Sequence, residues 1–150
     1  MELKEILLDF CWAHVNIKKD LLSKRSISLQ ESLNSETKSS AGDKHETGRA
    51  MVQLEQEKLG QQQVVLDQMQ RVLQQINIES QNQKVGLGNL VKTTLGTYFI
   101  AIGAGGFKIE NGEMVYCISA NSPIAQLVMG KMPGASYVFR GNTHKILKIT

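Results

Sequence analysis

Proline and glycine are distributed very unevenly along the chain, and this limits the folds open to it. Residues 1–80 contain no proline and only three of the 13 glycines, whereas both prolines and the other ten glycines follow Val85. These two residue types are the least compatible with a helix interior, so long helices fit only the first part. The change predicts two domains, residues 1–80 and residues 85–150.

Two apolar stripes with helical spacing lie in the first part. Their members are Leu3, Leu7, Phe10, His14, Ile17 and Leu21, and then Val65, Leu66, Met69, Val72, Leu73 and Ile76. The stripes can face one another only if the chain reverses between them. The segment SSAGDKHETG, residues 39–48, is rich in residues that disfavour continued helix. We therefore expect an antiparallel coiled-coil hairpin with its tip at residues 39–48.

The second part has the pattern of short strands separated by turns. The expected strands are Leu90–Thr94, Thr97–Ile102, Met114–Ile118, Tyr137–Phe139 and Lys145–Ile149. Between them, SPIAQLVMGK has the signature of one helix, with Ser122 as its cap, Pro123 in its first turn and Gly130 past its end. The chain is therefore predicted to be α+β, a helical hairpin followed by a small antiparallel β domain with one short helix.

Charge and hydropathy limit the compartment and the classes of partner that we expect for this protein. The longest apolar run, YFIAIGAGGF, is far shorter than the roughly 20 residues that span a bilayer. The N-terminus lacks the features of a secretory signal, so we expect a cytoplasmic protein with no membrane partner. A net charge of +3 does not establish nucleic-acid binding. Cys11 and Cys117 match no metal or redox spacing and are expected to be packing residues.

Asp43 and Glu46 lie three positions apart in the predicted tip. Carboxylates are ligands that Mg²⁺ prefers, and a site supplied mainly by a partner needs only one or two more. The same spacing just before a helix is also an N-terminal capping arrangement, which satisfies free N–H groups and the positive end of the helix dipole. Both interpretations are compatible with Glu46.

Several motifs together resemble the GreA/GreB family of bacterial transcript cleavage factors. The stretch IGAGGFKIENGEMVYCISANSPIAQLVMGKMPGASYVF resembles that family's strand, turn, helix and strand, and HKILKIT resembles its final strand. The tip GDKHE matches the family's Gly-Asp-x-x-Glu. The order of the parts also agrees, so the resemblance covers nearly the whole chain.

The resemblance implies a factor that binds the secondary channel of RNA polymerase and stimulates the polymerase's own cleavage of backtracked RNA. It implies an FKBP-like C-terminal domain, and no enzymatic activity of the chain itself. Asp43 and Glu46 would help hold a catalytic Mg²⁺ shared with the polymerase. The residues that would contact the polymerase itself are Asn121, Ser122 and Pro123. We expect a monomer that binds no metal stably when alone.

Two departures from the family pattern accompany this resemblance. After the glutamate the family usually continues Asn-Ala-Glu-Tyr, whereas this chain has TGRAM from Thr47, and Asn121 stands where the family often has aspartate. Basic residues near the hairpin are candidate contacts to nascent RNA or a solvated helix surface. They are Lys18, Lys19, Lys24, Arg25, Lys44 and Arg49.

Three other functions fit parts of the sequence. A secondary-channel regulator of the same fold would lack cleavage stimulation, and a plain interaction module would use the glutamine-rich second helix for dimerisation. A thiol-dependent acyl-transfer enzyme, such as a 3-oxoacyl synthase, would pair Cys117 with His144 or His14. The chain is too short for that enzyme's fold, and Cys117 lies within MVYCISA, which has the pattern of a buried strand.

Overall fold

The computed structural model describes the backbone of residues 2–38 and 42–150 and the side chains of residues 2–35 and 47–150. The chain divides into two compact units, one of Met1–His14 with Arg71–Thr150 and the other of Val15–Gln70. This division by contacts cuts each long helix, so the domain boundary expected near residues 80–85 stays a prediction. Among the described residues, no helix is both long and apolar enough to cross a membrane.

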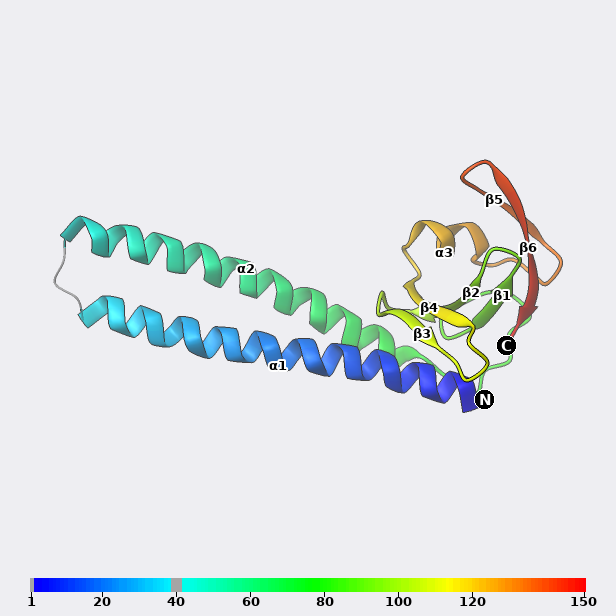
Figure 1. Cartoon of the computed structure of the whole chain (residues 1–150), viewed down its shortest axis with the longest axis horizontal. Coiled ribbons are helices and arrows are strands. Elements are labelled where there is room, and N and C mark those ends of the chain that lie inside the picture. Colours follow the sequence, from blue (N-terminus) through cyan, green and yellow to red (C-terminus); the bar gives the residue numbers. More distant parts are fainter. Residues whose placement is uncertain (1, 39–41) are drawn as a thin grey trace. The chain divides into compact units, whose positions relative to one another are not determined.

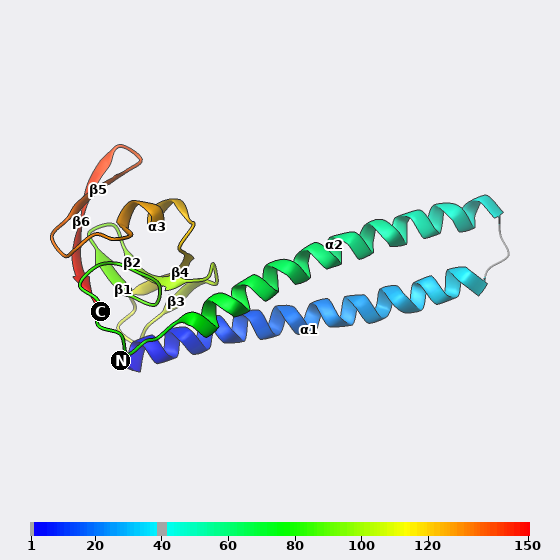
Figure 2. The same cartoon turned by 180° about the vertical axis from the view of Figure 1, so that it is seen from behind.

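The first part of the chain forms two long helices, α1 (Glu2–Lys38) and α2 (Gly42–Gln75). Figures 1 and 2 show them running side by side in opposite directions, which confirms the predicted hairpin. Helix α2 begins at Gly42, inside the segment expected to be the turn. An internal glycine costs a helix only about 1 kcal/mol, so Gly48 does not end it.

The seam between the helices keeps Leu66 and Met69 of the expected second stripe and adds positions that are seven residues apart. Leu22, Leu59 and Leu66 are buried together, with Leu29 and Met69 packed against them. Steps of seven residues keep a side chain at the seam of a coiled coil, and Leu22–Leu29 and Leu59–Leu66 are such steps.

Three residues expected at the seam lie outside it. Ile17 is 61% exposed, Leu21 is 52% exposed and Val65 is 49% exposed. At about 100° per residue, Leu21 lies well over a quarter turn from Leu22, and Val65 is rotated equally from Leu66. The sequence interpretation was therefore wrong for these three residues.

The second part forms a six-stranded sheet with one short helix. Its strands are β1 (Leu90–Thr93), β2 (Thr97–Ala101), β3 (Gly105–Lys108), β4 (Met114–Ser119), β5 (Ser136–Phe139) and β6 (Asn142–Ile149). The strand order is β3-β4-β2-β1-β6-β5, and every pair is antiparallel except β2 with β4. The predicted class, a helical hairpin followed by a mostly antiparallel β domain, is confirmed.

Strand β3 was absent from the sequence prediction. It begins with Gly105 and Gly106, and glycine is depleted in strands because it has no side chain to pack and loses much entropy on ordering. Its residues are extended because they pair with β4, with Gly105 opposite Cys117 and Phe107 opposite Val115. The local sequence does not favour a strand by itself.

The two faces of the sheet bury different residues. On one face Tyr98, Ile100 and Tyr137 pack with Ala125 and Val128 of α3 (Pro123–Val128). Because side chains alternate along a strand, Phe99 and its parallel partner Cys117 point to the other face. There the first turns of α1 cover the sheet, as the contact between the rings of Phe10 and Phe107 shows, with centroids 5.2 Å apart.

Candidate functional site

Asp43 and Glu46 occupy the first turn of α2, next to the reversal of the hairpin. Residues three apart lie on the same side of a helix, so the backbone places the two acids together. Their side chains, and that of Lys44, lie outside the described residues. Negative charge in this turn is favourable for the helix, because the free N–H groups give it a positive end.

A metal ion would find only part of a site at this position. Two carboxylates supply the hard oxygen ligands that Mg²⁺ prefers but leave most of its six positions to water or a partner. The positive end of α2 also opposes a cation there. Elsewhere, among the side chains that the structure describes, no three His, Cys, Asp or Glu residues are grouped as metal ligands. Two carboxylates are therefore fewer ligands than Mg²⁺ takes, and the shared metal site stays a prediction.

The predicted polymerase-binding residues lie in the loop that leads into α3. The Ser122 hydroxyl donates to the Ser119 carbonyl oxygen at 2.7 Å and accepts from the Ala125 N–H at 3.4 Å. This confirms Ser122 as the helix cap, and it commits the hydroxyl to the loop itself. Asn121 and Pro123 are exposed on either side of it. These two are the residues that a partner can contact directly.

The predicted basic residues do not form one group. Lys18, Lys24 and Arg25 are exposed on α1, and Lys18 and Arg25, seven positions apart, share one side of that helix. Lys19 is half-buried, and its ammonium donates to the side-chain oxygen of Gln70 on α2. Arg49 is exposed on α2. Lys19 therefore stabilises the hairpin rather than facing a partner.

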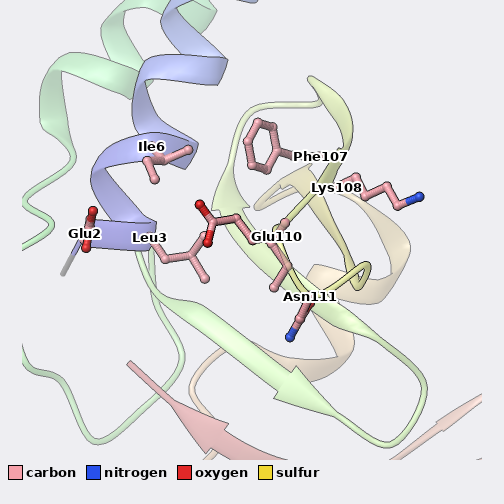
Figure 3. Close-up of a pocket in the computed structure, with 8 residues that line it drawn as sticks. Glu2, Leu3, Ile6, Phe107, Lys108, Glu110 and Asn111 are labelled. Carbon is pink, nitrogen blue, oxygen red and sulfur yellow. The ribbon is translucent and has the colours of Figure 1, made fainter.

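A pocket that the sequence did not predict lies between the start of α1 and strand β3 (Figure 3). Its volume is about 450 Å³, and its lining residues are Glu2, Leu3, Ile6, Phe107, Lys108, Ile109, Glu110 and Asn111. Figure 3 shows the Glu110 carboxylate directed toward α1 and the Lys108 side chain directed away from it. The walls come from segments about a hundred positions apart, so no local pattern could indicate the pocket.

Cys117 is not placed as a catalytic thiol. It is 2% exposed, and its thiol hydrogen-bonds to that of Cys11. That hydrogen bond and burial raise the pKa of the Cys117 thiol, which keeps it protonated and a poor nucleophile. His144 instead packs its ring against Tyr137, with centroids 5.5 Å apart. This arrangement argues against the acyl-transfer alternative.

The chain was compared with protein families, curated sequences and solved structures. No family model matches it, and no curated sequence matches it. Among solved structures, similarity is found to a bacterial factor. It is the GreA factor homolog 1 (Gfh1) protein of Thermus thermophilus, at 15% identity and a TM-score of 0.35, over 95% of this chain and 94% of that one. A likeness at this level assigns no function, and the fold described above follows from the chain's own elements.

Proposed function

We propose that this chain binds RNA polymerase in the cytoplasm, inserts its helical hairpin into the secondary channel and stimulates cleavage of backtracked RNA. The observation that carries the proposal is the start of α2 at Gly42, which places Asp43 and Glu46 in one helical turn beside the chain reversal. Their match to the Gly-Asp-x-x-Glu of GreA/GreB factors supports the same role.

The two acids would act inside the polymerase and not alone. A second Mg²⁺ stabilises charge on phosphate oxygens and activates water for phosphodiester hydrolysis. Asp43 and Glu46 would each contribute oxygen ligands to that ion, with the polymerase supplying the others. The chain would then be a donor of ligands rather than an enzyme.

The β domain would bind the outer surface of the polymerase. Asn121 and Pro123 would make the contacts, and Ser122 would hold the loop in position through its hydrogen bonds to Ser119 and Ala125. Nascent RNA would meet Lys18, Lys24 and Arg25, which are exposed on α1, together with Arg49 and Lys44 on α2.

A second candidate is a channel-binding regulator that does not stimulate cleavage. The residues after Glu46 favour it, since Thr47 and the following GRAM supply neither the amide nor the tyrosine that GreA/GreB factors carry there. The fold and the channel would be the same, and the effect on transcription would come from occupying the channel.

Transcript cleavage in halted elongation complexes separates the two. Asp43→Ala and Glu46→Ala should each abolish stimulation while leaving polymerase binding unchanged, because neither lies on the β domain. Glu57→Ala, which removes an exposed acid farther along α2, is the matched control and should behave as the unmodified chain. Binding of the unmodified chain without any stimulation of cleavage would favour the regulator, and stimulation that persists in both acid variants would reject their role as metal ligands. No binding to the polymerase would reject both.

A further inference from the structure

Two cysteines far apart in the sequence meet in the interior of the compact unit formed by Met1–His14 and Arg71–Thr150. Cys11 of α1 is 0% exposed and Cys117 of β4 is 2% exposed, and neither is in a disulfide. Their thiols hydrogen-bond to one another. Nothing in the proposed function uses this pair.

A second contact fixes α1 over the same strands. The ring of Phe10, next to Cys11, packs on the ring of Phe107 in β3, with centroids 5.2 Å apart. Phe107 lies opposite Val115 in the β3–β4 pairing, and Cys117 lies two residues beyond Val115 on the same face. The approach of the two sulfurs therefore follows from how α1 packs on the sheet.

The two thiols are unequal. A hydrogen bond from Cys117 lowers the pKa of Cys11, and an N–H···S bond from the backbone of Ile102 acts in the same direction against the effect of burial. Donating that bond raises the pKa of Cys117. Cys11 is thus the thiol that ionises first, and the thiolate is the form that attacks an oxidant.

The cover over the pair is thin on one side. Strand β3 is at the edge of the sheet, and Gly105, which lies opposite Cys117, is exposed. A side chain at Gly105 would meet no atom within 4 Å, so the space beside it is open. Short edge strands with few buried contacts open locally at low cost, which gives a small oxidant a route to the sulfurs.

We propose that Cys11 and Cys117 form a redox-sensitive pair that a hydroperoxide converts into an internal disulfide joining α1 to β4. The Cys11 thiolate attacks the outer peroxide oxygen, the O–O bond breaks and an alcohol or water leaves with a proton. The sulfur of Cys117 then attacks the Cys11 sulfenic acid, releasing water. The two thiols lose two protons and two electrons, and the peroxide takes them up as it is reduced.

Mass spectrometry of the whole chain tests this. Reduced protein is treated with hydrogen peroxide, quenched, unfolded and alkylated with iodoacetamide. We expect a monomer that has lost two hydrogens and takes up no iodoacetamide, and that accepts two equivalents after dithiothreitol. It should also melt at a higher temperature than the reduced protein. Two alkylatable thiols after peroxide, a sulfinic acid, or a covalent dimer would overturn the proposal.

Single-cysteine variants provide the control. Cys11→Ala and Cys117→Ala each retain one thiol, so peroxide should neither form the internal disulfide nor raise their melting temperature. An equal rise in either variant would assign the effect to other oxidised groups and reject the disulfide as its cause. The measurement on the unmodified protein stands even if a variant does not fold.

Discussion

Thr93 and Tyr137 form a buried polar contact whose two members should not be equally costly to remove. The Thr93 hydroxyl donates to the Gly96 carbonyl oxygen at 2.8 Å. A hydroxyl has one hydrogen, so the 2.8 Å contact with the Tyr137 hydroxyl requires Tyr137 to be the donor. The N–H groups of Leu95 and Gly96 also donate to the Thr93 oxygen, both at 3.1 Å.

These donor and acceptor roles determine how much each substitution should lower the free energy of unfolding. Tyr137→Phe removes one hydrogen bond and leaves the Thr93 hydroxyl with its other partners, so it should lower the free energy of unfolding by about 1 kcal/mol. Thr93→Val keeps the shape of the side chain but leaves the hydroxyl of Tyr137, a residue only 2% exposed, without an acceptor. Thr93→Val also removes the hydrogen bond to the Gly96 carbonyl oxygen, so it should lower the free energy of unfolding by about 2–3 kcal/mol.

Urea unfolding measures both changes. The single tryptophan, Trp12, is in the same compact unit as the sheet and reports its unfolding by fluorescence. The double variant should cost no more than Thr93→Val alone, because Tyr137→Phe then removes a hydroxyl that already lacks its acceptor. If Tyr137→Phe costs as much as Thr93→Val, or if the two effects simply add, Thr93 is not the centre of this contact.

Two further predictions concern the helices. Leu66→Ala, at a seam position that is 5% exposed, should lower the free energy of unfolding of the hairpin by about 2–5 kcal/mol in urea, whereas Val65→Ala, at a neighbour 49% exposed, should change it little. Lys4 is 2% exposed, and burial lowers the pKa of its ammonium below 10.5. The unfolded chain then binds this proton more tightly, so stability should rise with pH through the window below 10.5, and Lys4→Met, but not Lys24→Met, should flatten that rise.

Local patterns in the sequence predicted most of the secondary structure. The absence of proline before residue 80 indicated long helices, and Ser122 followed by Pro123 located the start of α3. Leu66 and Met69 of the expected stripes do lie in the seam. Ile17, Leu21 and Val65 were assigned to it wrongly, because a spacing of three and four fits more than one stripe. The steps of seven from Leu22 to Leu29 and from Leu59 to Leu66 were the better signal.

Features that depend on distant residues could not be predicted. Strand β3 exists because β4 pairs with it, and nothing in Gly105 or Gly106 favours a strand. The pocket beside Phe107 and the contact of Cys11 with Cys117 both need α1 to lie on the sheet, which no spacing along the chain encodes. The acidic pair was found from the sequence, and its place in the first turn of α2 came from the structure.

The seven-residue spacing of the hairpin seam has a consequence for how such a chain can change length. Removing seven residues from α1 and seven from α2 at matching levels would bring equivalent seam positions back into contact, because each helix would advance by two turns. The hairpin would become shorter by about 10 Å with its packing retained. Removing a single residue from one helix alone would rotate the seam residues beyond the deletion, such as Leu59 or Leu66, by about 100° and out of the seam. Evolution and protein engineers can therefore alter the length of this hairpin by whole heptads more readily than by single residues.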